Sequence, residues 1–268
     1  MDQKDKISVI TVVYNDAKNV ERTLVNIFEQ TYPFVEIVVV DGGSTDGTLD
    51  VLKKYDNRII WISEKDNGIY DAMNKGAKMA SGKWLIYRNV GDLFASNRAI
   101  EHIFEKQVDD DVCILHGDCR FICEMGEKVY IPAIINSNYD FTCMPIFHPS
   151  AFIKTSYQCK NPYDISYKSS ADFEFFLKAI FNGVKIEYRP ITIADYHYGD
   201  GISVKNWYLV LKENKRVLEE FGKKTNMFEY WLGIINMYLH NKVKIMLPQR
   251  LVKILQKRNL KAEGWTIH

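Results

Sequence analysis

The chain lacks the features that mark several large classes of protein. Its 268 residues contain no apolar run close to the roughly 18 residues that a transmembrane helix requires. The formal net charge is only +1, which gives no reason to expect a nucleic-acid binder. The opening MDQKDK leads directly into a strand-like segment, so the sequence predicts no signal peptide.

Cysteine is scarce and follows no metal-binding pattern. There are five cysteines, an odd number, and no two of them form the CxxC pairs that are typical of zinc sites. Structural disulfides are rare in the cytoplasm. We therefore expect reduced thiols in a cytoplasmic protein.

Glycine is absent from the first predicted strand-to-helix turn, which is Tyr14–Lys18. A dinucleotide-binding fold needs GxGxxG in this turn, so that fold is excluded. A nucleotidyltransferase would be expected to carry a glycine-rich, basic phosphate loop here, and the turn has none. A bound nucleotide would instead be held by side chains at the ends of several strands.

What the sequence does contain is enough apolar material for a large core, with 47% hydrophobic and 13% aromatic residues. Strand-like and helix-like segments alternate through its first part. Strands are predicted at 7–14, 34–40, 58–63 and 84–87, with helices at 20–28, from 49, and at 69–80. This alternation is typical of an open, mostly parallel α/β sheet flanked by helices.

The pattern weakens after Asp92. We expect helices at 99–104 and 169–182, strands at 112–116, 129–131 and 184–188, and a loop at 136–149. No specific pattern is visible between about 120 and 166. From Lys205 onward the sequence pattern is typical of helices. We therefore predict a main domain at 1–205 and a helical, basic C-terminal extension at 206–268.

The segment FVEIVVVDGGSTDGT, residues 34–48, is the first candidate for a binding site. A buried strand ends at Asp41, and glycines follow it that allow a ligand close to the backbone. Ser44 or Asp46 can cap the next helix. Asp41 could accept a hydrogen bond from a pyrimidine imide while Tyr14 stacks on the base; the alternative is a plain turn or capping aspartate.

Two further clusters of polar residues stand where ligands of such sheets bind. Asp71, Asn74 and Lys75 share one helical face near a helix N-terminus, where they could contact ribose or pyrophosphate, or form an ordinary solvated face. NVGD, residues 89–92, follows a predicted strand directly. Its carboxylate suits a hard divalent cation, although a simple turn explains the pattern equally well.

These segments together resemble the family-two inverting glycosyltransferases of bacterial polysaccharide synthesis, which have the GT-A fold. The resemblance rests on ISVITVVYND (7–16), QTYPFVEIVVVDGGSTDGT (30–48), SEKDNGIYDAMNKGAKMASG (63–82) and NVGD (89–92). The third segment is most similar to the colanic-acid type of capsule and exopolysaccharide transferases. FHPSAF (147–152), SSADFEFFLK (169–178) and GDGIS (199–203) resemble the second half of that group less specifically.

The resemblance implies a role for individual residues. It places the nucleotide base at Thr11, Val13, Tyr14 and Asp41. The ribose and diphosphate would lie along Asp66, Asp71, Asn74 and Lys75, with Asn89 and Gly91 beside them.

The resemblance also implies a metal site and a catalytic base. Asp92 would bind Mn²⁺ or Mg²⁺ through the diphosphate, but Asn89 and Gly91 stand where the family often has aspartates. Asp172 takes the place of the base that removes the acceptor's proton, with Glu174 as the second choice; the alternative for Asp172 is an aspartate that interacts with the helix dipole. His148 and His197 are lesser candidates for acceptor or loop contacts.

The implied activity is transfer of one sugar, with inversion, to a lipid-linked glycan. The donor would be a UDP-sugar, with a GDP-sugar as second choice. NVGD has fewer carboxylates than the motif of the family often has. This leaves an alternative open, namely a catalytically weak nucleotide-sugar-binding protein.

The C-terminal part suggests a location. An apolar segment at 230–239 precedes a run with seven basic residues and no acidic one at 242–261. A basic amphipathic helix of this kind is typical of a peripheral anchor at the inner face of the bacterial membrane. An ordinary helical subdomain or a dimer contact is the alternative.

Overall fold

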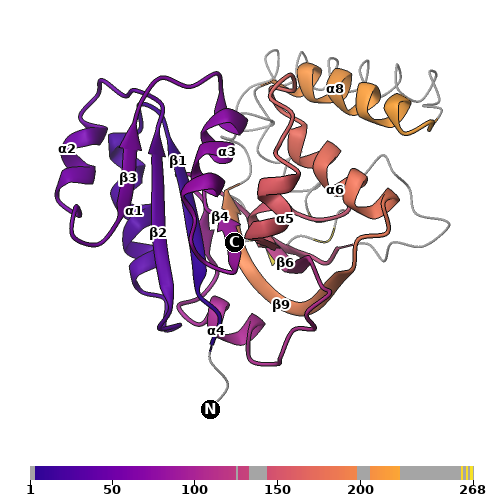
Figure 1. The fold of residues 1–268 in the computed structure, drawn as a ribbon, viewed down its shortest axis with the longest axis horizontal. Coiled ribbons are helices and arrows are strands. Elements are labelled where there is room, and N and C mark those ends of the chain that lie inside the picture. The colour runs from indigo at the N-terminus through magenta and orange to yellow at the C-terminus, as the bar shows by residue number, and fades with distance from the viewer. Residues whose placement is uncertain are drawn as a thin grey trace.

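The computed structural model describes residues 4–124, 126–132, 144–197 and 206–223, together with 261, 264, 266 and 267 (Figure 1). Four parallel strands form its first part. They run in the order β4-β1-β2-β3. Their bounds are β1 (Ile7–Val13), β2 (Val35–Asp41), β3 (Ile60–Ser63) and β4 (Trp84–Tyr87).

The helices between these strands also lie where the sequence predicts them. They are α1 (Ala17–Phe28), α2 (Thr48–Lys53) and α3 (Ile69–Met79). The predicted cap of α2 was wrong, because Gly47 occupies the N-cap position with φ +98°, a conformation that glycine adopts without strain. Asp46 still helps the helix start, since its Oδ1 accepts from the Thr48 N–H at 3.0 Å.

The second part extends the same sheet with antiparallel strands. β8 pairs antiparallel with both β4 and β6, whereas β9 runs parallel to β6. The elements are β5 (Leu93–Phe94), α4 (Ala99–Ile103), β6 (Ile114–Cys123), β7 (Gly126–Tyr130), a 3₁₀ turn η1 (His148–Ser150), β8 (Ala151–Lys154), α5 (Thr155–Lys160), α6 (Ala171–Phe181), β9 (Ile186–His197), α8 (Trp207–Glu220) and β10 (Thr266–Ile267). The predicted α/β fold class is confirmed.

Five elements of this part were not predicted: β5, η1, β8, α5 and β10. In addition, β9 is longer than the strand expected at 184–188. The loop predicted at 136–149 falls partly outside the described residues. Its described end turns into η1 at His148.

The sheet is covered on both faces by apolar side chains. Along β1, Ile7, Val9 and Val13 pack with residues of α1, α2 and α4, while Ile10 and Val12 pack with residues of α3 and α6. This alternation follows from the period of two in a strand. Burial on both faces explains why the strands read as continuous apolar runs.

The strand order reverses beside β1. The chain adds β2 and β3 on one side of β1 and then crosses to place β4 on the other side. Ligands of open α/β sheets bind at the carboxyl ends of the strands next to such a reversal. We therefore expect a ligand to bind beside the residues that follow β1 and β4.

Helix α8, the start of the predicted extension, packs into the core of the main domain. Val217 and Leu218 are buried in the same cluster as α6, and Glu213 accepts from the N–H groups of Lys168 and Ser169, both at 2.8 Å. The boundary at 205/206 stays a prediction. The basic segment at 242–261 lies almost entirely outside the described residues. Among the described residues, no helix is long and apolar enough to cross a bilayer.

The close packing of α3 on the sheet gives the first testable prediction. A Cβ at the buried Gly76 would overlap Ile10 Cγ2 and lie 3.4 Å from Val40 Cγ2. We expect Gly76→Ala to lower the free energy of unfolding by about 1–3 kcal/mol, because overpacking outweighs the better helix propensity of alanine. Urea unfolding would measure this. Lys78→Ala, at an exposed position of the same helix, should change stability by less than about 0.5 kcal/mol.

Candidate functional site

The residues predicted at the ends of β1 and β2 lie side by side. Val13 is paired in register with Asp41, and Asp41 with Ser63 of β3. Tyr14 follows directly and is 66% exposed, so its ring is free to stack on a planar ligand. Thr11 is fully buried, and its Oγ1 has no hydrogen-bond partner among the described residues.

Asp41 has a structural role in the turn that follows it. Its Oδ2 accepts from the Gly43 N–H at 3.0 Å, the Ser44 N–H at 2.9 Å and the Ser63 hydroxyl at 2.6 Å. The other oxygen, Oδ1, is buried and finds no partner in the described part of the chain. The turn aspartate that the sequence left as an alternative is thus present, and contact with a base through Oδ1 stays a prediction.

Asp66 and Tyr14 converge on Gly42. A Cβ at Gly42 would lie 2.5 Å from Asp66 Oδ2 and 3.3 Å from Tyr14 Cδ2. A side chain at position 42 would therefore require Asp66 to move. The structure therefore brings together three residues from separate loops at the carboxyl edge of the sheet, as the sequence predicts for a nucleotide site.

The predicted cluster on α3 divides into two groups. Lys75 Nζ lies 3.6 Å from Asp71 and 2.8 Å from Glu64, so Asp71 and Lys75 do share a face. Asn74 instead exchanges two hydrogen bonds with the backbone of Tyr163, both at 2.9 Å. This amide holds two parts of the protein together, and contact with a ribose is not needed to explain its position.

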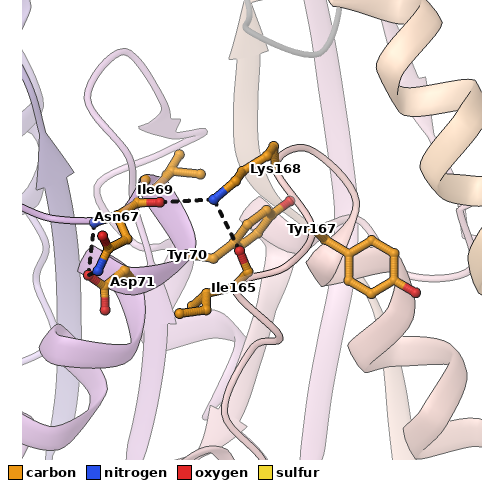
Figure 2. A pocket seen from close by; sticks show the side chains of 8 residues that line it. Asn67, Ile69, Tyr70, Asp71, Ile165, Tyr167 and Lys168 are labelled. Carbon is orange, nitrogen blue, oxygen red and sulfur yellow. Dashed lines mark hydrogen bonds between the residues drawn. The ribbon is translucent and has the colours of Figure 1, made fainter.

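A narrow cavity lies beside these residues, between the start of α3 and the segment that precedes α6 (Figure 2). Lys168 closes one side of it, since its Nζ donates to the Asn67 and Ile165 carbonyls, both at 3.2 Å. Like the pairing of Asn74 with Tyr163, this contact fixes the first half of the chain against the second.

Asp172 stands in the first turn of α6 and contacts α3. The Tyr70 hydroxyl donates to Asp172 Oδ1 at 2.9 Å. Burial raises the pKa of Asp172, which the hydrogen bond from Tyr70 opposes and the charge of Glu213 reinforces. A carboxylate with a raised pKa and a fixed orientation is suited to accept a proton. Glu174, the second choice, lies 3.9 Å from Lys178 and has no such positioning partner among the described residues.

An aromatic wall connects Asp172 to the end of β4. The wall consists of the rings of Tyr70, Tyr163, Tyr87 and His148. The centroids of successive rings are 5.4, 5.6 and 5.4 Å apart, and the last pair, Tyr87 and His148, is stacked. Burial, aided by the charge of Arg88, lowers the pKa of His148 to about 3, so this imidazole is neutral. His148 is thus a buried part of the wall.

His197 lies elsewhere. It ends β9, and its Nε2 is 3.4 Å from Nη2 of Arg22 on α1. The loop that was expected to begin here, GDGIS at 199–203, lies outside the described residues. Whether either histidine contacts an acceptor stays a prediction.

The NVGD segment forms a turn at the end of β4. The Asp92 N–H donates to the Asn89 carbonyl at 2.9 Å, and the Gly91 N–H donates to Thr23 Oγ1 of α1 at 3.1 Å. Gly91 has φ +100°, where a side chain would be strained. Burial raises the pKa of Asp92 to about 6, against the opposing charge of Arg88.

This turn offers few ligands to a metal ion. Asn89 Oδ1 is buried without a partner in the described part of the chain, so Asp92 and Asn89 could supply one carboxylate and one amide oxygen. Among the described residues, no group of three or more His, Cys, Asp or Glu could hold a metal. Mg²⁺ and Mn²⁺ prefer oxygen ligands and often take several from a phosphate substrate. The donor set fits such a shared site.

Sequence reasoning missed Arg88 and Tyr70. Arg88 is fully buried at the end of β4, and burial lowers its pKa to about 10. A charged residue directly after the apolar WLIY was a visible signal. Tyr70 lies within a segment whose polar residues alone were considered, and no local pattern predicts its contact with Asp172.

Comparison with known proteins gives a family. A model described as "Glycosyl transferase family 2" matches residues 8–162, more than half of the chain. A "PGL/p-HBAD biosynthesis glycosyltransferase" of Mycobacterium bovis is 28% identical over 213 residues, which cover 73% of this chain and 78% of that protein. "Glycosyltransferase AglE" of Haloferax volcanii is 40% identical over 126 residues, 45% of this chain and 41% of that one.

Solved structures of low identity share the fold. A fragment of S. aureus TarS in complex with UDP has a TM-score of 0.60 and 21% identity, with 80% of this chain and 65% of that chain covered. The mannosyltransferase PcManGT of Pyrobaculum calidifontis, in complex with GDP-Man and Mn²⁺, has a TM-score of 0.64 and 16% identity, covering 84% and 66%. The present chain thus spans about two thirds of the length of these structures.

The raised pKa of Asp172 predicts a dependence of stability on pH. A folded-state pKa above the unfolded value means that the contribution of Asp172 to stability is complete below the unfolded pKa and is lost as the pH rises through the folded pKa. Asp172→Asn keeps an oxygen for Tyr70 and removes this ionisation. We therefore expect the stability of the variant, relative to wild type, to increase between pH 4 and pH 8.

Thermal unfolding across this pH range would measure the difference. Asp110→Asn, which removes a carboxylate whose side chain is 97% exposed, serves as the control and tests whether the effect belongs to Asp172. A relative stability of Asp172→Asn that falls as the pH rises would contradict the assigned direction of the pKa shift.

Proposed function

Since the chain belongs to glycosyl transferase family 2, we propose that it transfers one sugar from a nucleotide sugar to an acceptor hydroxyl with inversion at the anomeric carbon. The observation that carries this proposal is the position of Asp172. Its half-buried carboxylate accepts a hydrogen bond from Tyr70 of α3. Asp71 and Lys75 of α3 lie beside Glu64, near the predicted nucleotide site. One rigid element thereby relates the candidate base to the donor.

A UDP-sugar is the proposed donor, with a GDP-sugar as second choice. The unpartnered Oδ1 of Asp41 suits the imide N–H of uracil, and the exposed ring of Tyr14 suits the face of a base. TarS structures in complex with UDP and with UDP-GlcNAc favour the first choice, and PcManGT in complex with GDP-Man keeps the second open.

The chemistry follows from the residues at the two ends of the aromatic wall. Asp172 removes the proton of the acceptor hydroxyl as the oxygen attacks the anomeric carbon, and the bond to the nucleoside diphosphate breaks on the opposite side. Tyr70 holds the carboxylate in the orientation for this transfer. When bound at Asp92, Mn²⁺ or Mg²⁺ would neutralise negative charge on the departing diphosphate.

We further propose a lipid-linked glycan as the acceptor, in the synthesis of a bacterial surface polysaccharide at the inner face of the membrane. The basic, amphipathic character of residues 242–261 supports this location. The alternative is a catalytically weak nucleotide-sugar-binding protein, which the single carboxylate of NVGD favours.

Thermal unfolding with UDP, GDP, CDP and CMP, each with and without Mn²⁺, tests the donor. A ligand that binds only the folded state at about 100 times its Kd stabilises it by about 2.7 kcal/mol. We expect UDP with Mn²⁺ to raise the Tm of wild type and of Asp172→Asn equally. Asp92→Asn should lose most of the part that depends on Mn²⁺.

Turnover tests the base. UDP release from UDP-sugars, with lipid-linked glycan extracted from bacterial membranes as acceptor, should fall about 10²–10⁴-fold in Asp172→Asn. Glu174→Gln should stay near wild type. A Tm shift with GDP alone would overturn the donor, and undiminished turnover in Asp172→Asn would overturn the base. Binding of UDP by wild type without turnover would favour the binding-protein alternative.

A further inference from the structure

Arg88 is a buried cation without hydrogen-bond partners. Its side chain is fully buried, and none of Nε, Nη1 and Nη2 has a partner among the described residues. A buried guanidinium whose N–H groups are all unsatisfied is costly, so native structures seldom retain one without a use for it.

The only other buried arginine in the described part of the chain shows the ordinary structural arrangement. Arg189 donates through Nε to Glu187, through Nη1 to the Ile103 and Lys106 carbonyls, and through Nη2 to the Gln107 carbonyl. Every nitrogen of this side chain is used. Arg88 differs from it in having its whole donor set unengaged.

The carboxylates near Arg88 do not satisfy it. Asp92 and Asp195 act on it electrostatically, but neither accepts a hydrogen bond from it. Asp195 already receives two hydrogen bonds from Arg120, at 2.8 and 2.7 Å. The ring of Phe94 lies 4.0 Å from the guanidinium carbon and holds the side chain in place through a cation–π contact.

Other unpartnered polar atoms lie next to Arg88. The Arg88 N–H donates to the Ile10 carbonyl at 2.8 Å, which continues the pairing of β1 with β4 and sets Arg88 beside Thr11. Thr11 Oγ1 and Oδ1 of the following Asn89 are both buried and lack partners in the described residues. Thr11 of β1 and the residues that follow β4 lie on the two neighbouring strands beside the reversal of strand order, where ligands of open α/β sheets bind.

We propose that Arg88 binds phosphate oxygens of the donor's diphosphate. A guanidinium forms paired, charge-assisted hydrogen bonds with phosphate and keeps its charge at any working pH. The proposal rests on the proposed function. In this role Arg88 supplies a fixed positive charge beside NVGD, a motif with a single carboxylate for a metal. The charge stabilises the departing diphosphate.

Access to Arg88 requires a shift of the 89–92 turn. This turn is only half-buried, and the hydrogen bond from the Gly91 N–H to Thr23 Oγ1 ties it to α1. As this turn shifts, a diphosphate would bring its negative charge to the guanidinium, with Asp92 still beside it.

Titration calorimetry on the full chain with UDP, inorganic pyrophosphate and uridine tests this role. Arg88→Met keeps much of the length and the contact with Phe94 but removes the charge. We expect its affinity for UDP and pyrophosphate to fall at least about tenfold, because charge-assisted hydrogen bonds are lost, with affinity for uridine unchanged. Arg88→Lys keeps a point charge and should retain part of the affinity.

Thermal unfolding without ligand separates binding from a structural role. Arg88→Met should unfold at the wild-type temperature or above it, because an unsatisfied buried charge has been removed. Arg189→Met, which leaves several carbonyls and Glu187 unpaired, should unfold at a clearly lower temperature.

Two results would overturn the inference: UDP affinity of Arg88→Met within twofold of wild type, or a lowered Tm with equal losses for UDP and uridine. Pyrophosphate distinguishes this failure from failure of the proposed function. If wild type bound pyrophosphate but no nucleotide, and Arg88→Met lost pyrophosphate, Arg88 would remain an anion site while the nucleotide-sugar donor would be wrong.

Discussion

Strand β1 is hydrogen-bonded in parallel to β2 on one side and to β4 on the other, and both faces of it are buried. After β1 the chain adds β2 and β3 on one side of β1 and then places β4 on the other side. A crevice forms at the carboxyl edge of the sheet where the strand order reverses in this way. Tyr14 and Arg88 directly follow β1 and β4, and Asp41 is the last residue of β2. Their proximity is a consequence of hydrogen bonding in the sheet, and it requires no affinity of the side chains for one another.

The site at this edge is assembled at a cost in stability. Thr11 Oγ1, Asp41 Oδ1, Asn89 Oδ1 and the Arg88 guanidinium are buried without partners among the described residues, and burial raises the pKa of Asp92 and Asp172. Unsatisfied buried polar groups destabilise a fold. The apolar clusters on both faces of the sheet supply the stability that offsets this cost. A ligand with complementary groups can form hydrogen bonds with these polar atoms.

The first half of the fold could be predicted from the sequence because its signals are local. Each apolar run such as Ile37–Val40 ends at a polar turn, and each helix has a clear apolar face. The antiparallel second half could not, since β8 is defined by pairing with β4, about 70 residues earlier, and nothing within AFIK specifies that partner. The same limit applies to the site. Motifs indicated Asp41, Asp92 and Asp172 as candidates, whereas the contact of Tyr70 with Asp172 spans 102 positions and is visible only in the folded chain.

Helix α3 is the element through which the two halves act together. Tyr70, in its first turn, donates a hydrogen bond to Asp172. Asn74 is hydrogen-bonded to the backbone of Tyr163. Lys168 donates to the carbonyl of Asn67, which lies just before the helix. These three contacts join α6 and the segment that precedes it to α3 and the residues just before that helix. A displacement substitution needs the attacking oxygen, the anomeric carbon and the leaving group in line, so small errors in relative position reduce the rate steeply. Fixing the candidate base to the helix beside the predicted nucleotide site meets this requirement within the architecture of the protein.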